Sequence, residues 1–238
     1  MGILTILLIV SVVLLIRAEN KDNKPITQIM DTDNKLESIA IGSIPRRKRS
    51  YSGYCSDENT AFTSDGGGNT VFLDRQSPDC GRQAMKKFLL DRNNGGNEVR
   101  YELRCCSLPS GFSDSPVTRH TDFNYDGRGN VAYLDRHHVS CPGSAFLKSF
   151  HLNRNSGHDM YRYTYSCYPP YSSTSTTCYR DSTRGNSIGY WRDWRRGKLI
   201  YLDRHSVSCR EGYFLNEFQL ANAGHRLIKY RYRCCTED

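Results

Sequence analysis

Apolar residues recur in the same order three times along this chain, and each series ends in an alternating pattern. In the first copy Val99, Tyr101, Leu103 and Cys105 alternate with charged residues. Successive side chains of a β-strand point to opposite faces, so this pattern predicts a strand with one buried face. The matching residues of the other two copies are Tyr161, Tyr163, Tyr165, Cys167 and Ile228, Tyr230, Tyr232, Cys234.

Each of these strands is preceded by apolar residues two apart and then by a turn rich in Gly and Asn. Phe88 and Leu90 precede the turn at 93–96, for example, which predicts a β-hairpin. A second Gly-rich turn lies further upstream in each copy. It leads into short apolar runs at 71–73, 131–134 and 199–202, which we also interpret as strands.

The three copies define unit 1 (51–107), unit 2 (114–168) and unit 3 (174–235). None shows the 3.6-residue periodicity of an amphipathic helix, so the prediction is an all-β fold. A unit of about 60 residues exceeds a solenoid repeat and has few apolar residues to bury alone. We therefore expect three tandem disulfide-bridged β repeats in one pseudo-threefold domain. A string of three separate modules is the alternative.

The ten cysteines indicate how the units are bridged. Units 1 and 3 have an upstream cysteine and a Cys-Cys doublet, whereas unit 2 lacks both the upstream cysteine and the second cysteine of the doublet. Two residues that vanish together are expected to be bonded to each other. In the alternating strand the first doublet cysteine faces the core and the second faces outward. The predicted pairs are Cys55–Cys106, Cys80–Cys105, Cys141–Cys167, Cys178–Cys235 and Cys209–Cys234.

The N-terminal segment is typical of a secreted precursor. Residues 1–18 contain an apolar run that is short for a membrane span, which predicts a signal peptide and no stable membrane span. Residues 19–49 are polar and end in Arg46, Arg47, Lys48 and Arg49, a site for a processing protease. The mature chain would be 50–238. A signal anchor and an uncleaved basic linker are the alternatives.

Charge and cysteine content restrict the partners. The chain carries +8, and eight of its 33 basic and five of its 25 acidic residues precede position 51, which leaves +5 afterwards. This excess favours anionic glycans, extracellular matrix or cell-surface components. Nucleic acid is excluded by the oxidising, extracellular location that the cysteines indicate.

A Leu-Asp-Arg triplet occurs in every unit. The planar guanidinium groups of Arg75, Arg136 and Arg204 could each grip an anionic or sugar group. In the structural alternative, the preceding aspartates hold the arginines or cap a turn, and threefold repetition is compatible with both readings.

Unit 3 carries an insertion that suits binding. It contains Trp191, Arg192, Trp194, Arg195 and Arg196, and Trp with Arg is a typical combination at binding hot spots. Core packing of the two tryptophans is the alternative. Because Arg184, Lys198, Arg231 and Arg233 are near in sequence, unit 3 is the predicted polyanion-facing region.

No catalytic or metal site can be assembled from the sequence. His137, His138 and His205 have no nucleophile motif or metal-ligand spacing around them, so we expect packed or surface histidines. Residues 122–127 resemble half of a calcium loop but lack the bidentate Glu, which favours an Asx turn. We expect a protein without enzymatic activity and without a cofactor.

The cysteine layout resembles the dermatopontin family of extracellular matrix proteins. The resemblance rests on residues 209–235, from Cys209 through Phe218 to Cys234-Cys235, and on the matching run 80–106. The family's Asp-Arg-Gln/Glu-Trp motif before the doublet is absent. The resemblance implies matrix or cell-surface binding. Together these observations predict a secreted, non-enzymatic binding protein for anionic glycans or matrix components. A propeptide-activated toxin or defence effector is the alternative.

Overall fold

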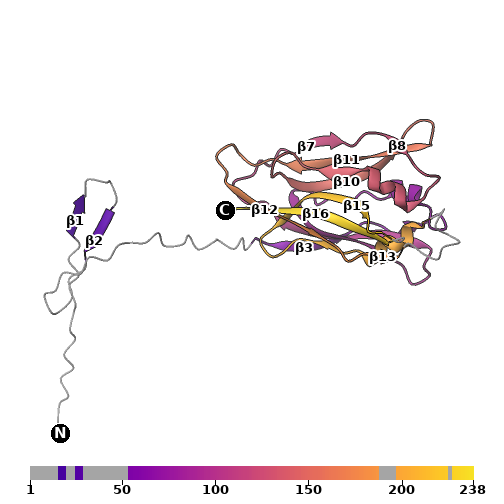
Figure 1. Cartoon of the computed structure of the whole chain (residues 1–238), viewed down its shortest axis with the longest axis horizontal. Helices are drawn as coiled ribbons and strands as arrows, with labels where there is room; N and C mark the ends of the chain where they lie inside the picture. The colour runs from indigo at the N-terminus through magenta and orange to yellow at the C-terminus, as the bar shows by residue number, and fades with distance from the viewer. Residues whose placement is uncertain (1–15, 20–24, 29–52, 188–196, 225–226) are drawn as a thin grey trace, which may run out of the picture. The chain divides into compact units, whose positions relative to one another are not determined.

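The computed structural model describes residues 16–19, 25–28, 53–187, 197–224 and 227–238. The chain divides into two compact parts, Met1–Lys48 and Arg49–Asp238 (Figure 1). In the first part, β1 (Ile16–Glu19) pairs antiparallel with β2 (Pro25–Gln28). The rest of the predicted signal peptide and propeptide, including the tetrabasic site, lies outside the described residues. Within the residues described, no helix has the length and apolar character needed to cross a membrane.

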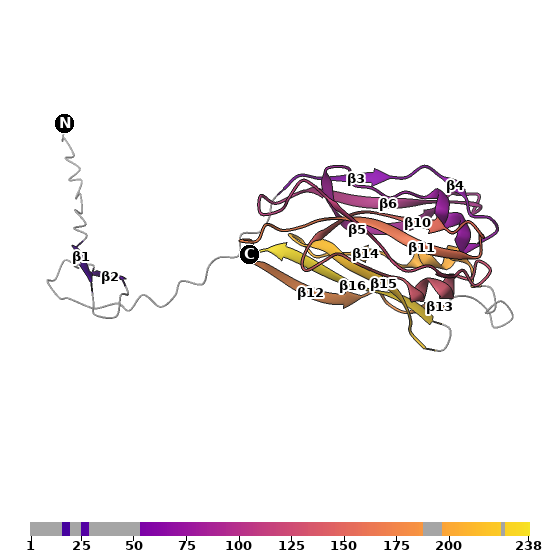
Figure 2. The ribbon, with the colours of Figure 1, turned by 90° about the horizontal axis from the view of Figure 1, so that it is seen from above.

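The second part is all-β and contains three antiparallel sheets, one around the long hairpin of each unit (Figures 1 and 2). The hairpins are β5–β6, β10–β11 and β15–β16. The second strand of each hairpin also pairs with a strand that comes earlier in the same unit. The bounds are β3 (Cys55–Asn59), β4 (Thr63–Ser64), β5 (Gln83–Arg92) and β6 (Glu98–Ser107) in unit 1; β7 (Val117–His120), β8 (Asn124–Tyr125), β9 (His138–Ser140), β10 (Phe146–Arg154) and β11 (Met160–Tyr168) in unit 2; and β12 (Thr176–Ser182), β13 (Asn186–Ser187), β14 (Val207–Ser208), β15 (Phe214–Asn222) and β16 (Leu227–Glu237) in unit 3.

The expected strands at 71–73, 131–134 and 199–202 are wrong. They are 3-10 helices: η1 (Thr70–Arg75), η2 (Val131–Arg136) and η4 (Leu199–Arg204). The side chains of Asn69 and Asn130 cap the first two by accepting a hydrogen bond from the backbone two residues on. In η2 the buried residues are Val131 and Leu134, which are three apart and therefore share one face of a 3-10 helix.

Each hairpin receives an edge segment from another unit. Unit 2 supplies β9 to β15, and unit 3 supplies β14 to β5. Unit 1 supplies residues 78–80 to β10, where Asp79 bridges to Ser149 and the Cys80 N–H donates to the Lys148 carbonyl at 3.1 Å. Unit 1 therefore pairs with unit 2, unit 2 with unit 3, and unit 3 with unit 1, in a closed cycle.

All five disulfides join the pairs that the comparison of the units predicts. The inner bridges, such as Cys80–Cys105, lie in the main core. The outward orientation of the second doublet cysteines needs correction, because Cys106 and Cys235 are also buried. They belong to a second apolar cluster in which Phe112, from the linker after unit 1, stacks on Phe146.

Unit 2 fills the place of its missing bridge with other residues. Tyr168 replaces the second doublet cysteine, is buried, and donates its hydroxyl to the Gly81 carbonyl at 2.6 Å. A cross-unit hydrogen bond thus stands where the other units have a disulfide.

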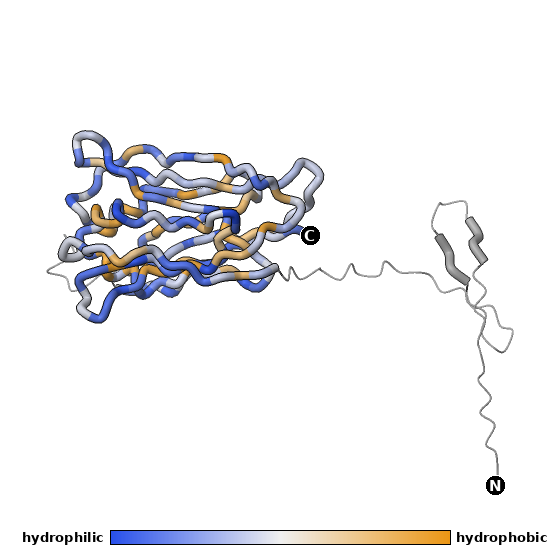
Figure 3. Tube along the Cα trace, turned by 180° about the vertical axis from the view of Figure 1, so that it is seen from behind, coloured by the Kyte–Doolittle hydropathy of each residue, from blue (hydrophilic) through white to orange (hydrophobic). Residues whose placement is uncertain are grey.

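Six aromatic rings form the centre of the main core. Phe88, Phe150 and Phe218 come from the three hairpins, and their ring centroids are 4.9–5.1 Å apart in edge-to-face pairs. A tyrosine from each hairpin packs between two of these rings, as Tyr101 does between Phe88 and Phe150. Such pairs add about 0.5–1.5 kcal/mol each beyond the area that they bury. Figure 3 shows apolar residues, in orange, recurring along the strands between hydrophilic ones.

The glycine-rich turns before the three 3-10 helices form a second closed cycle. The N–H of Thr70 donates to the Gly129 carbonyl, that of Val131 to Gly197, and that of Leu199 to Gly68, at 2.8–3.0 Å. Gly129 has φ +79°, and a Cβ there would lie 1.9 Å from the capping Oδ1 of Asn69. Glycine is thus required both for the backbone conformation and for close contact between units.

We expect Gly129→Ala to destabilise the protein by about 2–4 kcal/mol, since it adds a clash with Asn69 to the cost of a positive φ. Gly81→Ala is the matched control, because Gly81 has φ +62° but no atom within 4 Å of its added Cβ. Urea unfolding measures both variants. Equal losses would show that the contact between Gly129 and Asn69 contributes nothing.

Candidate functional site

The arginines of the three Leu-Asp-Arg triplets do not converge on one site. Each is exposed and stacks on the aromatic ring one 3-10 turn earlier: Arg75 on Phe72, Arg136 on Tyr133 and Arg204 on Tyr201, at 4.1, 4.2 and 4.9 Å from the ring centroids. Arg75 also lines a cavity of about 310 Å³ that contains Glu58 and Asp79. Those carboxylates make the cavity unsuitable for an anion.

The aspartates of the triplets hold neighbouring units together. Arg154 of unit 2 reaches Asp74 of unit 1 at 3.9 Å, and Arg92 of unit 1 reaches Asp203 of unit 3 at 3.7 Å. The other terminal nitrogen of each arginine donates to a carbonyl in its own hairpin turn. This arrangement favours the interpretation that the triplet aspartates stabilise the framework.

Within the described residues, the third triplet aspartate, Asp135, lacks the arginine partner that the other two have. Asp135 of unit 2 faces unit 3, where Asn222 stands in the place of Arg92 and Arg154. Burial raises the pKa of Asp135, and the charge of Arg136 lowers it only in part.

Asn222 accepts a hydrogen bond from the Gly224 N–H at 2.8 Å, which any longer side chain would give up. Asn222→Arg is expected to be more stable than Asn222→Gln by about 0.3–1 kcal/mol at pH 7, because only Arg supplies the missing cation beside a half-buried carboxylate. Asn222→Gln, which adds length without charge, is the control. Chemical denaturation at low and high salt tests the pairing, since a gain from charge must shrink as salt rises. Equal stability of the two variants would contradict it.

The residue after each triplet is buried and polar. Gln76 in unit 1 is fully hydrogen-bonded, and its Nε2 reaches the Val99 carbonyl at 3.0 Å. His137 and His205 take the same place in units 2 and 3. Each bonds a threonine hydroxyl through Nδ1, while its buried Nε2 has no partner within the described residues.

These two histidines are packed residues, which is one of the two alternatives that the sequence left open. Burial lowers the pKa of His137 to about 4, with a smaller effect from the charge of Arg136, and it also lowers the pKa of His205. His138 is exposed and lies 3.1 Å from Glu217. Among the residues that the structure describes, no group of three His, Cys, Asp or Glu side chains could hold a metal ion.

We expect the protein to lose stability as the pH falls from about 6.5 to 4. Over this range unfolded His137 binds a proton and folded His137 does not, so acid favours the unfolded state. His137→Gln, which copies unit 1, should remove on the order of 1–3 kcal/mol of this loss. His120→Gln is the matched control, because it removes one imidazole from the exposed surface. Urea midpoints at pH 7 and 4.5 measure both, and an unaltered pH dependence in His137→Gln would contradict the assignment.

The outer surface of the unit 3 sheet is rich in cations. Along β16, Ile228, Tyr230 and Tyr232 are buried, so the residues between them face outward. Arg180 of β12 lies directly opposite Arg233. The four residues that we call the basic face are Arg180, Lys229, Arg231 and Arg233.

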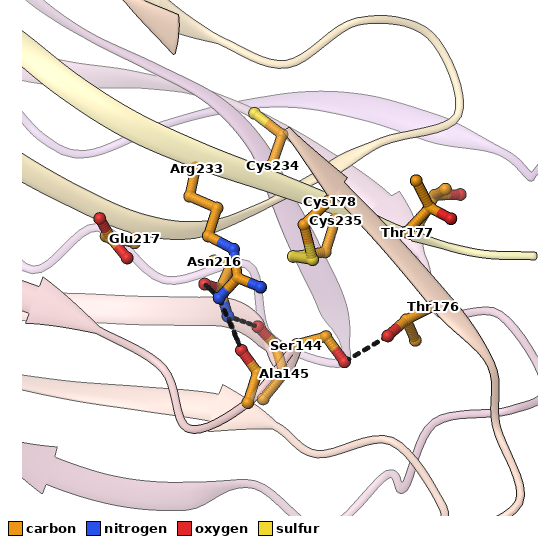
Figure 4. The surroundings of a disulfide bond; sticks show 12 residues. Ser144, Ala145, Thr176, Thr177, Cys178, Asn216, Glu217, Arg233, Cys234 and Cys235 are labelled. Carbon is orange, nitrogen blue, oxygen red and sulfur yellow. Dashed lines mark hydrogen bonds between the residues drawn. A yellow bond between two sulfur atoms is a disulfide. The ribbon is translucent and has the colours of Figure 1, made fainter. Parts of the chain in front are cut away.

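Some of these cations have polar partners and others do not. In Figure 4 the Arg233 side chain points toward Asn216, and its Nη1 donates to the Asn216 Oδ1 at 3.3 Å and to the Gly143 carbonyl at 3.0 Å. Glu217 lies 3.7 Å from Arg180. Lys229 and Arg231 form no ion pair with any described residue.

Unit 1 shows what the same sheet positions look like without this cationic character. There Asp57 lies where unit 3 has Arg180, and Glu102 lies where it has Arg231. The unit 1 charges are paired: Arg104 contacts Asp57 at 2.8 Å, and Arg100 contacts Glu102 at 2.9 Å. Arg180 and Arg233 are like charges opposed across strands, which is destabilising, and Glu217, opposite Arg233 on β15, offsets that cost only in part. Lys229 and Arg231 add further cations to the same face, so the face carries a net positive charge that the unit 1 positions lack.

The sequence had indicated unit 3 and two members of the basic face, Arg231 and Arg233. Arg180 and Lys229 were missed. Lys229 lies on the same face of β16 as Arg231, and only the pairing of β12 with β16 brings Arg180 beside them. The predicted tryptophan and arginine strip, residues 191–196, lies outside the described residues.

Comparison with known protein families and with characterised proteins finds no match for this chain. The resemblance to the dermatopontin family therefore rests on the layout of the cysteines and strands alone. Five disulfides indicate an oxidising compartment.

Proposed function

We propose that this protein is a secreted, non-enzymatic binding protein whose basic face engages sulfated or carboxylated glycans of the matrix or cell surface. The observation that carries the proposal is the replacement of acidic residues in unit 1 by arginines at the same positions of unit 3. An outward sheet surface with cations along neighbouring strands suits an extended polyanion. Arg is well matched to sulfate and carboxylate groups because its donors are planar and paired.

The fold supports this proposal because most of the basic face takes no part in joining the units; Arg233, which donates to the Gly143 carbonyl of unit 2, is the exception. Buried aromatic rings, disulfides and cross-unit ion pairs fix the units, and the basic face contributes to none of the disulfides or core clusters. We also infer that the closed exchange of edge segments reflects a pseudo-threefold arrangement of three repeats. A surface that differs so strongly between related units is then a specialised one.

The double variant Arg180→Asp/Arg231→Glu tests the basic face, because it installs the residues that unit 1 carries. We expect its affinity for heparin to fall about tenfold or more, a loss of at least about 1.4 kcal/mol. The double variant Arg119→Asp/Arg162→Glu is the control, since it makes the same charge change on the unit 2 sheet. Elution salt from a heparin column and titration with sulfated oligosaccharides measure both. Equal losses of heparin affinity in the two variants would show that net charge alone explains the binding, and would overturn the proposed role of the basic face.

A further inference from the structure

A cavity of about 900 Å³ lies where the glycine-rich turns of the three units meet. It is lined by backbone of these turns and by a few side chains, chiefly Arg128, Lys198, Tyr125 and Tyr133. Among the described lining residues two are cations and none is a carboxylate. Its volume is in the range of sites for small molecules, and its residues are separate from the basic face.

The carboxylates that adjoin the lining glycines in sequence are hydrogen-bonded within their own turns. Asp65 and Asp126 are buried, and each accepts a hydrogen bond from a backbone N–H two residues on, from Gly67 at 2.8 Å and from Arg128 at 2.7 Å. Neither Arg128 nor Lys198 forms an ion pair with a described residue. The lining therefore presents unneutralised positive charge.

Arg128 occupies a backbone position that favours glycine. Its φ is +56°, between Gly127 and Gly129, which also have positive φ. In unit 1 the equivalent position is Gly67, at φ +70°. An L-residue in this conformation costs free energy, yet the side chain of Arg128 is exposed and supports no other part of the described structure. A strained backbone at Arg128, on the wall of the cavity, indicates that its guanidinium has a role there, such as binding a ligand.

Two features of the cavity indicate which class of ligand it would bind. Tyr125 is 41% exposed and packs edge-on with Tyr133 at 5.8 Å, which offers an aromatic surface beside the cations. The cross-unit hydrogen bonds of Gly68, Gly129 and Gly197 hold the turns in place before anything binds. An aromatic ring next to two cations suits a sugar ring that carries an anionic group.

We propose that this cavity is a second binding site, for a mono- or disaccharide bearing sulfate or carboxylate. The anionic group contacts Arg128 and Lys198, and the ring packs on Tyr125. The basic face takes an extended polyanion, whereas this cavity takes a short anionic sugar, so the two sites are independent.

Isothermal titration of the full chain with glucose 6-sulfate and with glucuronic acid tests the site, with glucose and inorganic sulfate as comparison ligands. We expect both anionic sugars to bind and glucose to bind at least tenfold more weakly. Inorganic sulfate binding as tightly as glucose 6-sulfate would overturn the assignment to a sugar. If neither anionic sugar binds, the proposed site itself is wrong.

Two substitutions at equivalent positions make the test specific. Arg128→Gly should weaken binding of glucose 6-sulfate at least tenfold without lowering the melting temperature, since it relieves a strained backbone. Gly67→Arg should strengthen binding, because no described atom lies within 4 Å of its added Cβ. Arg119→Gln, on β7, is the charge control and should bind as the unsubstituted chain does. Undiminished binding by Arg128→Gly would contradict the proposal.

The same variants separate this site from the proposed function. Arg128→Gly should keep its retention on heparin, and Arg180→Asp/Arg231→Glu should keep its affinity for glucose 6-sulfate. Loss of both activities in Arg128→Gly would contradict independent sites.

Discussion

An isolated two-stranded hairpin leaves backbone groups unpaired along its edge and an apolar face uncovered, so it is marginally stable in water. In this protein each long hairpin has a segment of another unit along its edge, and the three apolar faces cover one another. The hydrogen bonds of residues 78–80, β9 and β14 to the neighbouring hairpins are therefore the interactions on which the domain depends. The disulfides, the aromatic centre and the glycine turns reinforce contacts that this exchange creates.

The strands and bridges could be predicted because both leave a simple trace in the sequence. Alternation at Val99, Tyr101 and Leu103 follows directly from the two faces of a strand. The joint loss of two cysteines in unit 2 identifies which thiols belong together. The 3-10 helices could not be predicted in this way, since a run of three or four apolar residues has no distinct period. Their identity depends on cap bonds such as that of Asn69.

The candidate sites were harder to predict than the fold, because they depend on residues that meet only after folding. Arg180 becomes part of the basic face through the register between β12 and β16, although it lies more than fifty positions before Arg231. Phe112 covers the outer disulfides although it belongs to a linker. From the sequence the triplet arginines could belong to ligand pockets or to the framework, and in the structure each stacks on an aromatic ring of its own 3-10 helix. The features repeated in all three units belong to the framework here, and the surface that we propose for binding is one in which the units differ.

The circular exchange of edge segments also limits how such a protein can change over evolutionary time. A solenoid can gain or lose a repeat because each repeat contacts only its neighbours in line. Here a fourth copy would have to open an existing junction, and loss of one copy would leave a donor segment without its acceptor. We therefore expect the copy number to stay constant while individual copies diverge at their surfaces. Diversity in this architecture can accumulate through side chains more readily than through length.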